Sequence, residues 1–232
     1  MPQTALNLIA VGIFLMTMTC LLGPIFHIPP VVPAALTFGI LGLATADTLS
    51  WNNRGVSLLL DLFASGEQRQ RIVNHEAGHF LTAYFLGIPI TGYTLTAWEV
   101  LKQGQLGRGG VSFDTESLTA EPFELANMRL TLERFCTVWM AGIAAEKIVY
   151  GDSQGGAEDR QQLRQALMMA GLPKIGYTQK ERWAQLQATN LLIRHRQSYD
   201  ALVEAMKERA TVGECYAVIQ KHCNTDNEKL AA

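Results

Sequence analysis

Residues 73–79 read VNHEAGH and lie inside a segment, 67–86, whose apolar residues recur at steps of three, four and seven. This periodicity predicts one helix, which Gly87 brings to an end. His75 and His79 are one turn apart, so they lie about 40° from each other on one face of that helix. Their two imidazoles can therefore converge on a single metal ion.

The residues between these histidines add a proton acceptor. Neutral imidazoles suit zinc, and a catalytic zinc keeps one position open for water. Glu76 lies about 60° from His79 around the helix, close enough to take a proton from that water. The motif predicts a zinc hydrolase with Glu76 as its base. The competing interpretation is a pair of partly exposed histidines with a helix-favouring glutamate between them.

A third protein ligand must come from elsewhere in the chain. We expect His27 in a turn, and His195 and His222 on the surface of polar helical segments. Asp159 follows a glycine-rich stretch after a predicted helix, 123–150, at the start of the next helix. An acid in a first turn is commonly a capping residue, so these residues alone leave the third ligand open.

Five stretches occur in order along residues 69–222: VNHEAGH at 73–79, AGIAAEKIVYGD at 141–152, GAED at 156–159, LLIRHRQSYDAL at 191–202 and ERATV at 208–212. Together they resemble the peptidase domain of the FtsH-type membrane zinc metalloproteases. The resemblance implies a zincin-like helical peptidase domain that acts on protein or peptide substrates.

The same resemblance assigns roles to individual residues. It implies one Zn²⁺ per chain, held by His75, His79 and Asp159, with Glu146 orienting a ligand. It also implies that the edge of one strand receives an extended substrate. The residues of that strand are Gly110, Val111, Ser112 and Phe113. A small structural sheet is the alternative interpretation of this segment.

The chain departs from the family in one major respect. Only about 20 residues separate its apolar N-terminal part from the peptidase-like segment, and no GxxxxGK[ST] phosphate loop occurs. We therefore expect an endopeptidase without its own ATPase, acting on membrane or membrane-near proteins. A homo-oligomer and association with ATPase-bearing FtsH-type subunits both stay open. The alternative is a non-catalytic scaffold or assembly factor with a structural zinc. Smaller departures are Phe80, Ile143 and Glu158.

Two apolar runs, 5–26 and 31–46, precede the first charged residue, Asp47. About 20 apolar residues cross a bilayer as a helix, so the runs predict a hairpin of two transmembrane helices. A cleaved signal for the first run and a buried or re-entrant second run are the alternatives. We expect an integral protein of a bacterial inner membrane, or of an organelle or photosynthetic membrane. Its peptidase domain would face the cytoplasmic or equivalent side.

The composition of the chain argues against several other classes of protein. The net charge of −2 lacks the basic excess typical of nucleic-acid binders, and four cysteines without a CxxC pair argue against a disulfide framework or a cysteine zinc site. The predicted fold class is mostly α with a small β hairpin, 93–99 and 110–114, around a flexible loop, 102–109. The predicted domains are a membrane hairpin (1–50), an interfacial connector (51–66), the zinc peptidase domain (67–223) and a flexible tail (224–232).

Overall fold

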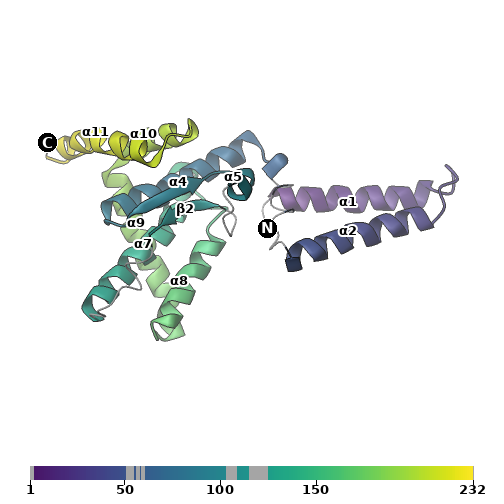
Figure 1. The fold of residues 1–232 in the computed structure, drawn as a ribbon, viewed down its shortest axis with the longest axis horizontal. Helices are drawn as coiled ribbons and strands as arrows, with labels where there is room; N and C mark the ends of the chain where they lie inside the picture. The colour runs from purple at the N-terminus through teal and green to yellow at the C-terminus, as the bar shows by residue number, and fades with distance from the viewer. Residues whose placement is uncertain are drawn as a thin grey trace. The chain divides into compact units, whose positions relative to one another are not determined.

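The computed structural model describes residues 3–50, 55, 58, 61–102, 109–114 and 125–231. This part of the chain is mostly helical, with one two-stranded antiparallel sheet (Figure 1). It forms two compact units. The hairpin unit comprises Met1–Gly66 and Thr96–Gly109, and the core unit comprises Glu67–Leu95 and Gly110–Ala232.

The hairpin unit contains α1 (Gln3–Leu22), α2 (Val31–Ser50) and the short α5 (Ala97–Lys102). Large apolar side chains of α1 and α2 are exposed, among them Phe14 and Phe38. Within the described residues, none of the helices combines the length and the apolar character that a membrane crossing requires. This finding does not support the two predicted transmembrane spans. Half of the predicted interfacial connector, at 51–54, 56–57 and 59–60, lies outside the described residues.

The helix predicted over 67–86 is confirmed as α4, Gly66–Phe85; because it carries the candidate ligands His75 and His79, we call it the metal helix. Its end follows the expected glycine signal. Ile88 N–H donates to Ala83 O at 2.9 Å and Gly87 N–H donates to Tyr84 O at 3.2 Å, while Gly87 adopts a φ of 69°. This pair of hydrogen bonds is the Schellman ending, which needs a left-handed residue at that position.

The first predicted strand, 93–99, is wrong in its extent. Strand β1 covers Ile90–Thr94 and pairs antiparallel with β2, Gly110–Phe113, so the second strand is confirmed. The chain then turns into α5 because Thr96 Oγ accepts the Glu99 N–H at 3.2 Å, an N-cap that stops the strand. Residues 103–108 of the predicted flexible loop lie outside the described residues.

Helix α7 forms the centre of the core unit. Phe135, Val138 and Ala141 of α7 belong to one core cluster with residues of α4, α9, α10 and α11. Met140 and Ile143 belong to a second cluster with residues of α8 and α9. The helices of this part are α7 (Leu125–Tyr150), α8 (Ala157–Met169), α9 (Tyr177–Arg194), α10 (Arg196–Lys207) and α11 (Val212–Ala231), with a 3-10 turn, η1 (Lys174–Gly176). Helices α10 and α11 lie side by side (Figure 1). Helix α11 continues to Ala231, where the sequence predicted a flexible tail.

Helices α4 and α7 cross at a glycine. A Cβ at Gly78 would lie 2.7 Å from both Ala141 O and Ala145 Cβ, closer than real Cβ contacts. Only a residue without a side chain allows the two backbones to approach this closely. The crossing brings the histidine face of α4 against the second half of α7.

Candidate metal centre

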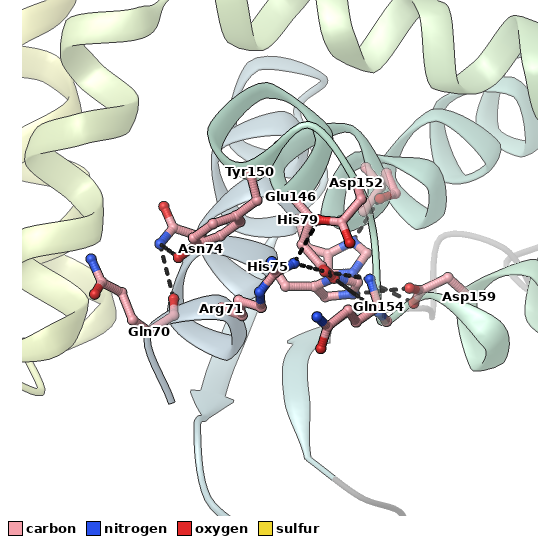
Figure 2. Close-up of polar contacts among 12 residues, drawn as sticks. Gln70, Arg71, Asn74, His75, His79, Glu146, Tyr150, Asp152, Gln154 and Asp159 are labelled. Atoms are coloured by element: carbon pink, nitrogen blue, oxygen red, sulfur yellow. Dashed lines mark hydrogen bonds and ion pairs between the residues drawn. The ribbon is translucent and has the colours of Figure 1, made fainter. Parts of the chain in front are cut away.

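The two histidines of α4 converge on one carboxylate at the start of α8. His75 Nε2 lies 3.0 Å from Asp159 Oδ2, and His79 Nε2 lies 3.4 Å from Asp159 Oδ1. One potential ligand atom from each of the three residues lies within 4.8 Å of the others. Figure 2 shows these three side chains turned toward one another. The geometry thus brings together the two histidines of the HExxH motif and the aspartate that the family resemblance implied as the third ligand.

The opposite nitrogen of each imidazole fixes which nitrogen is free for a metal. His79 Nδ1 lies 2.7 Å from the backbone oxygen of Val138, which can only accept, so Nδ1 carries the hydrogen. His75 Nδ1 lies 2.6 Å from Glu146 Oε1, an ionised carboxylate that also accepts. In both neutral rings the lone pair is then on Nε2, the atom that faces Asp159. This is the tautomer that zinc-binding histidines use.

Two lone pairs and a carboxylate at this spacing attract a cation. Burial lowers the pKa of His75, but the carboxylates of Asp159 and Glu146 outweigh burial and raise it to about 10. The pKa of His79 is raised for the same reason, since Asp159 outweighs its burial. Burial raises the pKa of Asp159, but the two histidines hold it well below its usual range. Protons or a divalent metal can supply the positive charge, and the donor set fits zinc.

Glu146 stabilises the loop that positions Asp159. Its Oε2 accepts the Gln154 N–H at 2.8 Å, and its Oε1 accepts the Gly155 N–H at 3.2 Å. Burial raises its pKa, but the hydrogen bonds from His75 and Gln154 outweigh burial and lower it. The carboxylate therefore links α7, the following loop and His75, which is where the resemblance placed an orienting group.

Gly142 of α7 leaves the space that the imidazole ring of His75 occupies. A Cβ at Gly142 would lie 2.4 Å from His75 Nε2 and 2.5 Å from its Cδ2. These distances are below any real Cβ contact, so a side chain at this position must displace the imidazole. The AGIAAE stretch thus supplies both a carboxylate for His75 and the space for its ring.

Glu76 reaches strand β2. Its Oε2 accepts the Val111 N–H at 3.1 Å. Burial raises the pKa of Glu76, and the neighbouring His79 and His75 only partly oppose this. A carboxylate whose pKa moves toward neutrality is suited to accept and return a proton.

The predicted substrate strand divides into two parts. Val111, with Gly110 beside it, lies against Glu76, so the edge of β2 that faces away from β1 borders the metal helix. Phe113 instead packs edge-to-face on Phe135 in the core, with ring centroids 6.2 Å apart. Ser112 O accepts a hydrogen bond from Thr91 of β1. Only the first half of the strand thus borders the candidate site.

Residues behind the metal helix were not anticipated from the sequence. The Tyr199 hydroxyl of α10 donates to Asn74, which also donates to Tyr150. Arg71, one turn before His75, contacts Asp152 at 3.0 Å. The helical spacing of Arg71 from His75 was a usable signal, because residues four apart share a helix face.

The expectation that His195 lies on the surface is wrong. Its side chain is buried and stacks on Phe85, with ring centroids 3.8 Å apart and an interplanar angle of 17°. The residue lies at the corner between α9 and α10, where the chain folds back onto the core. His222, the other C-terminal histidine, is partly exposed.

The fold and the site agree with the zincin class: a helical unit in which one HExxH helix and a later carboxylate form a potential metal site. No family model matches the chain. It is 35% identical over 97 residues to the ATP-dependent zinc metalloprotease FtsH 1 of Methylacidiphilum infernorum (isolate V4). The aligned stretch is 41% of this chain and only 14% of that protein. The similarity is thus distant and partial.

Proposed function

We propose that this chain is a zinc-dependent endopeptidase whose metal is held by His75, His79 and Asp159. The observation that carries the proposal is the convergence of two Nε2 atoms and one carboxylate, with each imidazole fixed through its Nδ1. Glu76, on the same helix, provides the base. The partial similarity to a zinc metalloprotease supports the identity of the metal.

A bound zinc supplies Lewis acidity, which polarises the scissile carbonyl and lowers the pKa of water. The protein groups do the rest. Glu76 accepts the proton of the attacking water and returns it to the departing amine. Glu146 and Val138 hold the Nδ1 hydrogens of the two histidines, so that both rings keep their orientation through the reaction.

Strand β2 is our proposed substrate-binding edge. In the described part of the chain, β1 is its one strand neighbour. The N–H of Val111 points toward Glu76 and away from β1. An extended peptide added along this edge would lie beside the metal helix, joined main chain to main chain. This mode favours loosely structured protein substrates.

We further propose that the peptidase acts as a homo-oligomer or in association with ATPase-bearing FtsH-type subunits. The exposed apolar side chains of α1 and α2 support attachment to a membrane, because apolar patches of this extent rarely face water. Its substrates would then be membrane proteins and proteins close to the membrane. Retention of the full chain in the membrane pellet at alkaline pH tests the attachment, and complete release into the supernatant contradicts it.

The test of the catalytic proposal is cleavage of casein, a loosely structured protein, by the zinc-loaded chain and by its Glu76→Gln variant. We expect zinc-dependent cleavage by the natural chain, loss of cleavage with a chelator, and recovery on adding zinc back. The variant should bind one zinc per chain and cut at least about 100-fold more slowly. Equal cleavage by both proteins at equal zinc content contradicts the proposal.

The alternative is a scaffold that keeps this fold to bind partners, with a structural zinc. It predicts that the Glu76→Gln variant fully rescues a strain from which the chain has been deleted. The enzyme proposal predicts that this single change abolishes rescue, while a nearby exchange outside the site, Arg69→Met on the exposed side of α4, preserves it.

A further inference from the structure

Arg71 lies one helical turn before His75 on α4, and its side chain is only 12% exposed. Four groups surround its guanidinium. Nη1 lies 3.0 Å from Asp152 Oδ1 and 3.8 Å from Glu146 Oε2, and Nε lies 3.5 Å from Glu67 Oε1. The guanidinium carbon lies 4.2 Å from the centre of the Tyr150 ring. Figure 2 shows Arg71 together with Glu146, whose carboxylate contacts His75.

The two oxygens of Glu146 have different neighbours. Oε1 faces the imidazole of His75 at 2.6 Å, whereas Oε2 faces Arg71 and accepts the Gln154 N–H. The carboxylate is 3% exposed, so water screens these contacts little. A cation on the Oε2 side attracts this carboxylate and favours its present orientation. That orientation directs Oε1 at the Nδ1 hydrogen of His75.

The contact with Asp152 alone would suggest a simple tether between α4 and the loop after α7. Asp152 is 62% exposed, however, and ion pairs with exposed partners contribute little to stability. The arginine that makes the contact is nearly buried, and its fixed planar fork is held against Tyr150. This placement suits a residue that acts on Glu146 more than one that only joins two surfaces.

We propose that Arg71 is a positioning residue of the metal centre, which acts through Glu146 on His75 and thereby tightens zinc binding. The inference rests on the proposed zinc site. It concerns no atom that touches substrate, and it assigns a role to a residue that the HExxH motif does not include. Partners of metal-bound histidines typically change metal affinity by about 10–100-fold, and a residue one step further out should change it less.

The experiment is a double-mutant cycle on zinc affinity, measured by competition with a chelating dye. The proteins are the natural full chain, Arg71→Met, Glu146→Gln and the double variant. We expect Arg71→Met to weaken zinc binding roughly 3–10-fold and Glu146→Gln roughly 10–100-fold. Because Arg71 acts through Glu146, its replacement should cost less than twofold more in the Glu146→Gln background.

Three controls separate positioning from general structural damage. Arg69→Met makes the same chemical change at an exposed position of the same helix and should leave zinc affinity unchanged. Asp152→Asn breaks the tether while keeping Arg71, and should change affinity less than Arg71→Met does. Arg71→Lys keeps the charge and should recover part of the affinity, which tests the proposal even if Arg71→Met folds poorly.

Two results overturn the proposal. One is zinc affinity of Arg71→Met and of Arg71→Lys within twofold of the natural chain. The other is an equal loss from Arg71→Met with and without Glu146. If the natural chain itself binds no zinc, the proposed metal centre and this inference both fail. A natural chain that binds one zinc while the cycle shows no coupling overturns only the role of Arg71.

Discussion

The metal centre and the α1–α2 hairpin are both helical, but their side chains are held in opposite ways. At the centre, polar groups from α4, α7 and α8 contact partners 59–84 positions away in the sequence. On α1 and α2, threonine hydroxyls mostly bond the carbonyl four residues earlier, and the apolar side chains are exposed. Tertiary contacts thus fix the centre, whereas the hairpin is shaped by its local sequence. Changes at the centre should therefore have large effects on metal binding, and changes in the hairpin should have almost none.

The largest expected effect is at Asp159. Asp159→Asn removes the charge that both Nε2 atoms face, so zinc affinity should fall by more than about 100-fold, beyond the range for outer partners. Glu158→Gln makes the same change in charge at the neighbouring exposed residue and should leave affinity within twofold. Isothermal titration with zinc measures both. Equal losses in the two variants would mean that overall charge, and not ligation, attracts the metal.

Proton competition should come next in size. The pKa of His75 is raised to about 10, so zinc must displace its proton at neutral pH. Apparent zinc affinity should fall by about tenfold for each unit that the pH drops below 10, with proton release into the buffer. In the metal-free protein the sign is opposite. The stability that this raised pKa contributes is fully present below 6.5 and is lost as the pH rises through about 10.

Titrations in buffers of different ionisation enthalpy count the released protons. Release of about one proton or more per zinc at pH 7.5 agrees with a protonated His75. Zinc binding without proton release, and with constant affinity from pH 6 to pH 9, would contradict the arrangement of carboxylates around this histidine.

A pair of glycine substitutions compares the two regions directly. Gly142→Ala would place a Cβ 2.4 Å from His75 Nε2, so we expect a loss of about 1–3 kcal/mol in the free energy of unfolding and weaker zinc binding. Gly39→Ala lies in α2 with nothing within 4 Å of the added Cβ. Alanine favours a helix over glycine by at most about 1 kcal/mol, so this variant should be neutral or slightly more stable.

Thermal unfolding with and without zinc measures both glycine variants. A Gly142→Ala protein that keeps its stability and its zinc affinity would mean that the ring of His75 does not lie against α7 as described. A Gly39→Ala protein that loses zinc affinity would mean that the hairpin and the centre are coupled, which removes the contrast between them.

Local signals predicted much of this architecture. The spacing of His75 and His79, the glycine ending of α4 and the strand at Gly110–Phe113 all depend on neighbours in the sequence, and they were found correctly. Helix α5 was missed because the apolar and aromatic residues after β1 suggested a longer strand, while the capping hydroxyl of Thr96 decided otherwise. The signal was present as Thr96 followed three positions later by Glu99.

Long-range contacts explain what the sequence alone left open. From the sequence alone, Asp159 would be interpreted as a capping residue. In the structure, Glu146 binds the loop before α8, and Asp159 then faces His75. From the sequence alone, His195 would be interpreted as a surface residue, but Phe85, far earlier in the chain, stacks against it. Arg71 has partners at 146, 150 and 152 that no helical pattern connects with it. Family resemblance supplied the role of Asp159, because the resemblance carries this tertiary information.

The most direct test of the metal centre is X-ray absorption at the zinc edge of the zinc-loaded chain. The centre predicts a shell of nitrogen and oxygen neighbours at about 2.0–2.2 Å, with outer scattering from two imidazoles and no sulfur. The imidazole contribution should drop by half in His79→Ala. A sulfur shell at about 2.3 Å, or a spectrum that His79→Ala leaves unchanged, would contradict ligation by His75, His79 and Asp159.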